Sequence, residues 1–226
     1  MRIKLICLAL ALSLCSLAVI RTSAFSDVYR CISTKDKKIA LTFDDGPHYK
    51  YTDRILDILE SYGVKATFFV IGVNAEKYPE KVKKIASHGH EIGNHTYSHP
   101  HLKSISDEEL QREIEKASDI ISKITDKTPT IFRPPEGFCG KNITSTAEKC
   151  GCSVILWSHD TRDWAHTPSA DISKKILDGV KCGDIILFHD FITPDTPTPD
   201  ALEDVIPKLI ERGYEFLTVS ELISAE

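Results

Sequence analysis

The feature that most constrains the fold is a regular alternation of short apolar segments with amphipathic helical patterns. The apolar segments are rich in β-forming residues and lie between turn signals, which is typical of buried strands. The predicted strands are Lys38–Phe43, Val64–Ile71, Ile131–Phe132, Ser153–Trp157, Asp184–Phe188 and Glu215–Val219, with a weaker one at His90–Gly93. Strands that alternate with helices form a parallel sheet, and about seven such repeats suffice to close a barrel.

Apolar residues at helical spacing predict helices between these strands. They share one face within Ile55–Leu59, and a longer apolar face runs over Leu110–Ile124 after Ser106 and Glu109, which are arranged as a capping box. Further helices are predicted at Glu80–Ser87, Asn142–Cys150, Ala170–Val180 and Ala201–Glu211, and a loop at Thr193–Asp200. No long linker or internal repeat interrupts the pattern, so we expect one α/β domain.

The N-terminus is predicted to be a segment separate from the folded domain. Arg2 and Lys4 precede the apolar run Leu5–Ile20, and small residues follow at Thr22–Ala24. A positive start, an apolar centre and a small-residue cleavage site are typical of a secretory signal peptide. The run has about 16 residues, fewer than the roughly 20 that span a bilayer, and an uncleaved anchor is the alternative. The predicted layout is a signal at 1–24, an N-terminal extension at 25–36 and the folded domain at 37–226.

Composition and charge exclude two broad classes of protein. Hydrophobic residues make up 42% and charged residues 27%, which is ordinary for a chain with a packed core and argues against disorder. The net charge of -5 argues against a nucleic-acid binder, which usually has a basic face. The cysteines that follow the signal are Cys31, Cys139, Cys150, Cys152 and Cys182. They contain no CxxC pair, so we expect one or two structural bridges plus buried thiols, and no cysteine-based zinc site.

Two carboxylates end the first predicted strand, where Thr42–Pro47 places Asp44 and Asp45 before a Gly-Pro turn. Two adjacent carboxylates cannot both stay ionised in a dry site without a compensating cation. The turn could aim both acids into one cleft. A solvated turn is the alternative, because Asp-Gly-Pro is a common turn sequence.

A histidine pair forms the second motif, His95–His99. Histidines four residues apart lie on one face of a helical turn and can chelate one metal ion. With a carboxylate after the first strand, they would make a set of two histidines and one aspartate with open coordination positions. That set suits zinc hydrolysis or the oxygen chemistry of non-haem iron. We interpret His88, His90 and His101 as structural, because no partner singles them out.

Three more polar clusters follow predicted strands, at Arg133–Gly137, Trp157–Trp164 and Leu187–Asp190. Arg133 could hold a carboxylate ionised and oriented, and tryptophans near a polar cleft often form platforms for sugars. Each cluster has a plain alternative: a rigid Pro-Pro loop, core tryptophans, or a satisfied buried histidine at position 189. Five such clusters at strand termini instead indicate one site at the carboxyl ends of the strands.

With these motifs the sequence resembles the polysaccharide deacetylase family, also called carbohydrate esterase family 4 or the NodB homology domain. The matching segments are Thr42–Pro47, His95–His99, Arg133–Gly137, Asp160–Trp164 and Leu187–His189. The resemblance covers about residues 37 to 221, and its first two motifs together are highly specific. It implies a single-domain α/β fold, a distorted (β/α) barrel of about seven parallel strands. It also implies a metal-dependent hydrolase that removes N-acetyl groups from amino sugars and releases acetate.

The resemblance implies a role for each residue of the first three motifs. Asp45, His95 and His99 would bind the divalent metal, usually zinc, with cobalt or nickel sometimes found. Asp44 would be the general base, and Arg133 would hold it in place.

The last motifs would supply the acid and the walls of the groove. By the same resemblance, His189 would be the general acid, tuned by Asp163, and Trp164 and Leu187 would bind the substrate. Pro135–Glu136 would belong to the same wall, and a backbone N–H near Glu136 would stabilise the oxyanion.

One position departs from the family pattern, because Glu136 stands where the family usually has an aromatic residue after the two prolines. The change removes a stacking surface and adds an acid, which would favour a cationic or partly deacetylated glycan. An exported, acidic chain fits peptidoglycan as the first substrate and chitin or chitooligosaccharides as the second, and a secreted or cell-wall location.

Two other functions stay as alternatives, a non-haem iron oxygenase and a glycan-binding pseudoenzyme. An oxygenase would have no need for both Asp44 and His189, and a pseudoenzyme would not need to retain the chemically active residues of every motif. An N-acetylated glycan is the expected partner. No protein partner is implied, and the chain would contact a membrane only if the N-terminal segment is uncleaved.

Overall fold

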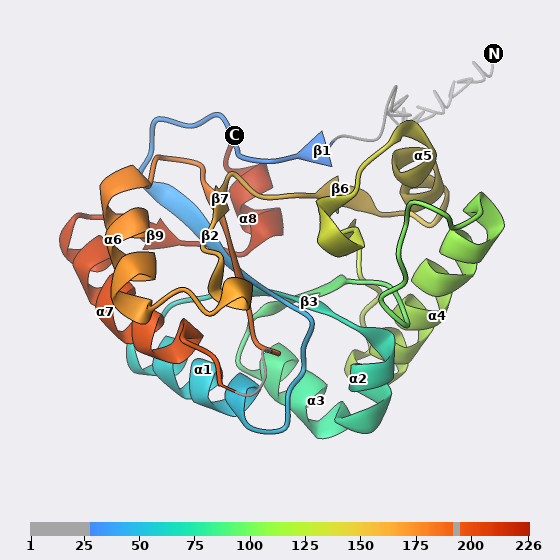
Figure 1. Cartoon of the computed structure of the whole chain (residues 1–226), viewed down its shortest axis with the longest axis horizontal. Helices are drawn as coiled ribbons and strands as arrows, with labels where there is room; N and C mark the ends of the chain where they lie inside the picture. Colours follow the sequence, from blue (N-terminus) through green and yellow to red (C-terminus); the bar gives the residue numbers. More distant parts are fainter. Residues whose placement is uncertain (1–27, 192–194) are drawn as a thin grey trace, which may run out of the picture.

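A parallel sheet of nine strands runs through the centre of the protein (Figure 1). The structure is a computed structural model and describes residues 28–191 and 195–226. The strands are β1 Val28–Tyr29, β2 Lys38–Asp44, β3 Thr67–Val70, β4 Glu91–Asn94, β5 Ile131–Phe132, β6 Ser153–Ile155, β7 His159–Asp160, β8 Ile185–His189 and β9 Glu215–Phe216. They lie in the order β1-β6-β5-β4-β3-β2-β8-β7, and β9 pairs with β2. All strand pairs are parallel, which confirms the predicted α/β class.

The sheet curls into an open, distorted barrel whose described strands end at β1 on one side and β7 on the other. The N-terminal extension takes part in it. Strand β1 pairs with β6, and Cys31 forms an isolated antiparallel bridge with Asp184, directly before β8. Residues ahead of the predicted domain start at 37 therefore contribute a strand and a bridge to the same sheet.

Helices pack around the outside of the sheet (Figure 1). They are α1 Tyr51–Ser61, α2 Gly72–Lys77, α3 Pro79–Ser87, α4 Asp107–Thr125, α5 Lys141–Lys149, α6 Ser169–Gly179, α7 Thr198–Glu211 and α8 Val219–Ser224. The predicted helices agree with these to within a few residues, and α7 begins inside the predicted loop Thr193–Asp200. The cap of α4 also forms, since the Ser106 hydroxyl accepts a hydrogen bond from the Glu109 N–H.

The last predicted strand, Glu215–Val219, is too long by three residues. Thr218 and Glu221 form a reciprocal capping box, in which each side chain accepts a hydrogen bond from the other residue's N–H. Such a box stabilises a helix start, so Val219 begins α8 instead of continuing the strand. Helix α2 was also missed, because six residues are too few to establish a helical period.

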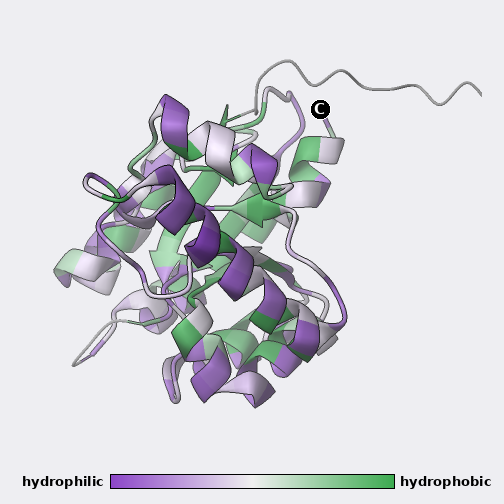
Figure 2. Cartoon of the chain, turned by 90° about the vertical axis from the view of Figure 1, so that its right-hand side faces the viewer, coloured by the Kyte–Doolittle hydropathy of each residue, from purple (hydrophilic) through white to green (hydrophobic). Residues whose placement is uncertain are grey.

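The core lies on both faces of the sheet. Phe43 stacks against Phe68 and Phe188, with ring centroids 4.9 Å and 5.7 Å apart. Figure 2 shows hydrophobic strands inside and hydrophilic helix surfaces outside. A parallel sheet is covered on both faces, which explains why its central strands are nearly continuous apolar runs.

The expected disulfide bridges are absent from the described residues, where Cys31, Cys139, Cys150, Cys152 and Cys182 are all free thiols. That expectation is wrong for this structure. Burial raises the pKa of the Cys152 thiol to about 12, which keeps it protonated and unreactive.

The predicted signal at 1–24 lies outside the described residues. Within residues 28–191 and 195–226, no helix has the length and apolar character needed to cross a bilayer.

Candidate active site

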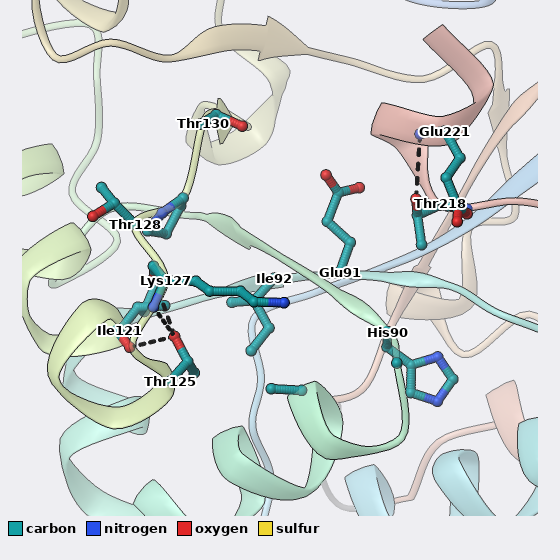
Figure 3. A pocket seen from close by; sticks show the side chains of 13 residues that line it. His90, Glu91, Ile92, Ile121, Thr125, Lys127, Thr128, Thr130, Thr218 and Glu221 are labelled. Atoms are coloured by element: carbon teal, nitrogen blue, oxygen red, sulfur yellow. Dashed lines mark hydrogen bonds between the residues drawn. The ribbon is translucent and has the colours of Figure 1, made fainter. Parts of the chain in front are cut away.

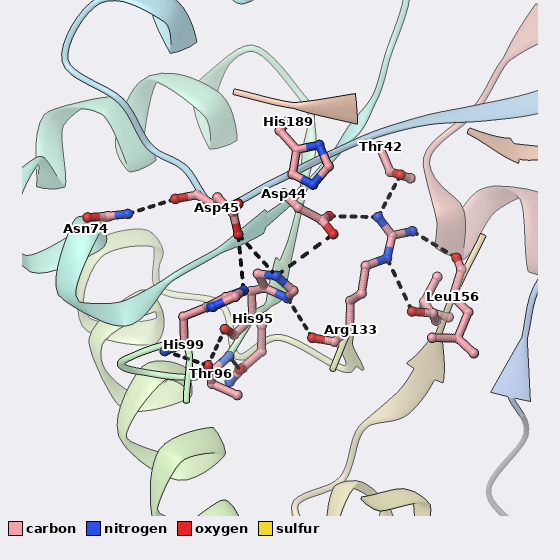
Figure 4. Close-up of polar contacts among 12 residues, drawn as sticks. Thr42, Asp44, Asp45, Asn74, His95, Thr96, His99, Arg133, Leu156 and His189 are labelled. Atoms are coloured by element: carbon pink, nitrogen blue, oxygen red, sulfur yellow. Dashed lines mark hydrogen bonds and ion pairs between the residues drawn. The ribbon is translucent and has the colours of Figure 1, made fainter. Parts of the chain in front are cut away.

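Residues of all five motifs line one cavity at the carboxyl end of the sheet. Figure 4 shows the polar groups of four of these motifs, from Asp44 to His189. Asp44 ends β2 and is paired in register with His189, which ends the neighbouring strand β8. Strands β4 and β5 end directly before His95 and Arg133. Because parallel strands present their carboxyl ends at one edge, motifs far apart in the sequence become neighbours.

Asp45, His95 and His99 bring three possible metal-ligating atoms together. Asp45 Oδ1 lies 3.4 Å from Nε2 of His95 and 3.4 Å from Nε2 of His99. One ligand atom from each residue lies within 4.8 Å of the others. Asp45 Oδ1 is buried and accepts no hydrogen bond, which is costly for a carboxylate unless a cation lies beside it. This oxygen and the donor set of two histidines and one carboxylate fit a divalent metal ion.

The loop that carries the histidines is not helical, so the predicted helical turn is wrong. Thr96 and His99 have φ angles of 66° and 57°, in the left-handed region. Asn94 Oδ1 accepts a hydrogen bond from the Thr96 N–H at 2.8 Å, and Glu113 of α4 accepts from two further N–H groups of the loop. The histidines converge because Asn94 and Glu113 shape the loop. Sequence reasoning missed both, since neither stands in a motif.

Backbone contacts orient the His95 ring. Its Nδ1 lies 2.7 Å from the backbone oxygen of Arg133, so Nδ1 carries the proton and Nε2 keeps its lone pair for a ligand. Metal-binding histidines are commonly oriented by such a contact on the far nitrogen.

A buried ion pair joins Arg133 to Asp44. The guanidinium Nη1 donates to Asp44 Oδ1 at 2.7 Å and to the Thr42 hydroxyl at 2.8 Å, and the other nitrogens donate to backbone oxygens of β6 and the following residue. The Arg133 side chain is fully buried, with its Cζ 4.1 Å from the ring centroid of Phe69. Burial lowers the pKa of Arg133, and the charge of Asp44 opposes that effect. Asp44 is thus held through Oδ1, while Oδ2 faces His95 Nε2 at 3.9 Å.

A second carboxylate orients His189 on the other side of the cavity. Asp163 Oδ1 lies 2.7 Å from His189 Nδ1, and its Oδ2 accepts hydrogen bonds from the His189 N–H at 2.7 Å and the Thr198 hydroxyl at 2.6 Å. Burial opposes a charge on His189. The hydrogen bond to Asp163 and the charges of Asp44 and Asp45 outweigh burial and raise the pKa of His189 to about 9. Thr198 of α7 was missed, because no sequence signal connects it to Asp163.

The cavity between these groups has a volume of about 420 Å³. Its lining residues are Asp44, Asp45, His95, His99, Glu136, Trp157, Asp160, Trp164, Leu187 and His189. Trp164 is 51% exposed, which leaves its ring open to a ligand. Pro135 is buried and does not line the cavity, although the sequence suggested it as part of the substrate wall.

Glu136 stands at the rim of this cavity in a short turn. Its φ of 56° is left-handed, and its carboxylate lies 3.0 Å from His101 Nδ1, with both side chains exposed. Gly137 follows with a φ of 65°, and an added Cβ would lie 2.5 Å from the Trp157 ring. The glycine therefore allows the turn to pack against Trp157. His101, interpreted as structural from the sequence, meets Glu136 at the edge of the groove.

Asp190 is a buried carboxylate that packs against Gly46, next to the candidate metal ligand Asp45, and no sequence motif predicts a role for it. It is 1% exposed, and its Oδ2 accepts a hydrogen bond from the Thr52 hydroxyl at 2.5 Å. Burial raises its pKa to about 7, with the charges of Asp45 and Asp44 adding to the effect.

A second cavity, of about 310 Å³, lies at the amino end of the strands and contains no motif residue (Figure 3). His90 lines it, and its Nδ1 accepts a hydrogen bond from the Ala66 N–H at 3.2 Å. Burial lowers the pKa of His90 to about 4. His90 is a neutral, hydrogen-bonded core histidine, as predicted.

Comparison with known proteins identifies the same family as the motifs. Residues 32–155 match the polysaccharide deacetylase family. A peptidoglycan-N-acetylglucosamine deacetylase from Bacillus cereus is 40% identical over 194 residues, which cover 85% of this chain and 91% of that protein.

Solved structures agree with this match. A crystal structure of a peptidoglycan N-acetylglucosamine deacetylase has a TM-score of 0.85 and 36% identity, over 88% of this chain and 94% of that one. A CE4 family pseudoenzyme from Bacillus anthracis has a TM-score of 0.82 and 29% identity, over 88% of this chain and 69% of that one. The parallel sheet, the convergence of all five motifs on one cavity and these similarities lead to one conclusion: the chain belongs to the polysaccharide deacetylase family.

Proposed function

We propose that this protein is a metal-dependent hydrolase that removes N-acetyl groups from the amino sugars of peptidoglycan and releases acetate. One observation carries the proposal: in a single cavity, three residues that could bind a metal ion are flanked by a carboxylate held by arginine and by a histidine held by aspartate. Amide hydrolysis needs a base for the attacking water and an acid for the leaving nitrogen. An oxygenase would have no use for that pair.

The metal would be held by Asp45, His95 and His99, and we propose zinc. Two histidines and a carboxylate form a common catalytic zinc set that leaves positions open. When bound, zinc makes a water acidic near neutral pH and polarises a carbonyl oxygen.

Asp44 is the proposed general base. Its Oδ1 is engaged by Arg133, so Oδ2 is the oxygen available to take a proton from the attacking water. Fixing one oxygen leaves a single direction from which the other can act, and the buried guanidinium of Arg133 lies 2.7 Å away as the counter-charge of the carboxylate.

His189 is the proposed general acid. Since Asp163 engages Nδ1, the proton for the leaving nitrogen comes from Nε2. A pKa raised to about 9 keeps the ring charged at neutral pH, as an acid must be before transfer. The products are acetate and a free amino sugar.

The substrate groove is formed by Trp164, Leu187 and Trp157, which line the cavity beside the catalytic groups. Leu187 provides an apolar wall for the acetyl methyl group, and the exposed Trp164 ring provides a stacking face for a sugar. The Glu136 N–H is the proposed donor to the developing oxyanion. A cell-wall substrate requires action outside the membrane, which agrees with the signal predicted at 1–24.

The proposal is tested by measuring acetate release from peptidoglycan, chitooligosaccharides and acetylxylan, with and without added zinc and with and without oxygen. We expect release that requires a divalent metal, does not require oxygen, and is fastest on peptidoglycan. Asp44→Asn should abolish most of it while zinc still binds. Faster release from chitooligosaccharides would reassign the substrate, and no release from any acetylated glycan would identify a pseudoenzyme.

A further inference from the structure

Asp190 connects to both ends of the loop that carries the candidate metal ligand Asp45. At the start of the loop, the Asp190 N–H donates to the backbone oxygen of Asp44 at 3.2 Å. At the end of the loop, Thr52 links Asp190 to His48. The Thr52 hydroxyl donates to Asp190 Oδ2 at 2.5 Å and accepts from the His48 N–H at 2.7 Å. Asp190 and Thr52 are both buried.

Between these ends, the Asp190 carboxylate lies directly against Gly46. A Cβ added to Gly46 would stand 2.1 Å from Asp190 Oδ1 and 2.2 Å from Oδ2, far inside contact distance. The carboxylate thus occupies the space that a side chain at position 46 would need. Asp190 Oδ1 is buried and has no hydrogen-bond partner, so its contact with Gly46 is one of close packing and not a hydrogen bond.

The loop needs such support because Asp45 has a φ of 74°. A left-handed conformation of a residue other than glycine is sparsely populated and persists only where its surroundings impose it. From the other side, Asn74 Nδ2 donates to the Asp45 backbone oxygen at 2.7 Å and the Ile71 N–H donates to the Gly46 oxygen at 3.0 Å. The backbone of Asp45 and Gly46 is therefore held between Asp190 on one side and Ile71 and helix α2 on the other.

We propose that Asp190 is a positioning residue that presses the Gly46 backbone into the conformation in which the Asp45 carboxylate faces His95 and His99. It acts through Thr52 and Gly46 and touches no reacting atom. The inference rests on the proposed function, in that Asp45 must be a metal ligand.

Zinc affinity of the folded full-length chain tests the role without relying on activity. Asp190→Ala should weaken zinc binding about 10- to 100-fold, the usual effect of removing a group that orients a metal ligand. Thr52→Val should act in the same direction and less strongly. Asp190→Asn keeps the shape and an acceptor for Thr52, and should bind zinc nearly as wild type does.

Asp184 offers a matched control at the opposite end of the same strand. It is 7% exposed and accepts hydrogen bonds at 2.7 Å from the Ser158 hydroxyl and the Lys181 N–H. Asp184→Ala should lower thermal stability and leave the zinc Kd of the folded protein unchanged. If Asp190→Ala behaves the same way, Asp190 is only a structural residue and the inference is wrong.

A double-mutant cycle tests the contact itself. Gly46→Ala should reduce zinc affinity strongly, because its methyl group would overlap the Asp190 carboxylate. Gly46→Ala combined with Asp190→Ala removes the overlapping atoms and should recover at least about tenfold of the loss, a coupling expected only for residues in contact. Simple addition of the two losses would overturn the inference.

Failure of this inference differs from failure of the proposed function. If Asp45→Ala binds zinc as tightly as wild type, the metal assignment itself is wrong. If Asp45→Ala loses zinc while every Asp190 and Thr52 variant keeps it, only the positioning role is wrong.

Discussion

The two ends of the sheet have cavities of similar size but opposite chemistry. At the amino end, Glu91 accepts hydrogen bonds from Thr67 at 2.9 Å and from the Ser220 N–H at 3.1 Å, and His90 is paired with a backbone N–H. At the carboxyl end, Asp45 Oδ1 is buried without a donor, beside two histidines. The polar groups of the amino end are satisfied by the protein, whereas the carboxyl end requires a ligand to complete it.

This difference shows that cavity volume does not identify the functional end. Buried polar groups are normally paired, so a carboxylate oxygen that is unpaired and lines a cavity beside two histidines marks the place where the protein binds something else. Substitutions at the two ends should therefore have separable effects, on chemistry at one end and on stability at the other.

The largest expected effect is that of Asp44→Asn at the carboxyl end. Asparagine can still accept from Arg133, but it cannot take a proton, so kcat should fall about 10²- to 10⁴-fold. Zinc affinity should change little. Glu91→Gln is the matched control at the amino end, and its kcat should equal that of wild type. A comparable loss of kcat in Glu91→Gln would remove the distinction between the two cavities.

The next effect concerns the pH dependence set by Asp163. A general acid must be protonated, so activity falls as pH rises through its pKa, which for His189 is raised to about 9. Asp163→Asn removes the main group that raises this pKa. The alkaline limb of the kcat profile should therefore move to lower pH, and kcat should fall by about 10²-fold.

The measurement is kcat on peptidoglycan across the pH range at saturating zinc. Asp184→Asn removes a buried carboxylate distant from His189, and it should leave the profile in place. An alkaline limb that stays unchanged in Asp163→Asn would show that another group supplies the proton.

A smaller effect is expected for His90→Leu at the amino end, and it concerns stability alone. Loss of Nδ1 leaves the buried Ala66 N–H without a partner, which should lower the free energy of unfolding by about 1–3 kcal/mol. Urea unfolding and kcat, measured on the same samples, check this. A loss of kcat in the folded variant would contradict the separation of the two ends.

His90 also predicts the acid response of wild type. Its pKa is lowered in the folded protein to about 4. As pH falls below about 6.5, His90 of the unfolded chain therefore becomes protonated while His90 of the folded protein stays neutral. This part of the stability is complete above about 6.5 and is lost progressively towards about 4. The free energy of unfolding of His90→Leu should lack this loss between pH about 6.5 and about 4.

The smallest effect is expected at the rim, for Glu136→Tyr. An added aromatic contact is worth about 0.5–1.5 kcal/mol, so the ratio of kcat/KM on chitooligosaccharides to that on peptidoglycan should shift by about two- to tenfold. An unchanged ratio would show that Glu136 does not determine substrate preference. His101→Gln removes the Glu136 partner and is the control for an effect of the ion pair.

The sequence predicted the parallel sheet well because buried parallel strands are continuous apolar runs and amphipathic helices repeat with a different period. The ends of helices and strands are predicted less accurately. Val219 is a β-branched residue that favours a strand, and only the capping box of Thr218 and Glu221 makes it the start of a helix. The spacing of His95 and His99 correctly predicts that the two side chains lie close together. It wrongly predicts a helical turn, because the segment between them is a loop with left-handed residues.

The order of residues along the chain shows which chemical groups stand at strand ends, because the direction of parallel strands is enough to bring such groups to one edge. How each group is held depends on the folded structure. The contacts that the sequence did not suggest join residues far apart in the chain: Thr198 donates to Asp163, Glu113 accepts from the histidine loop, and Asp190 packs against Gly46. Such contacts depend on packing distances and on the desolvation of buried charges, which no local pattern of residues encodes.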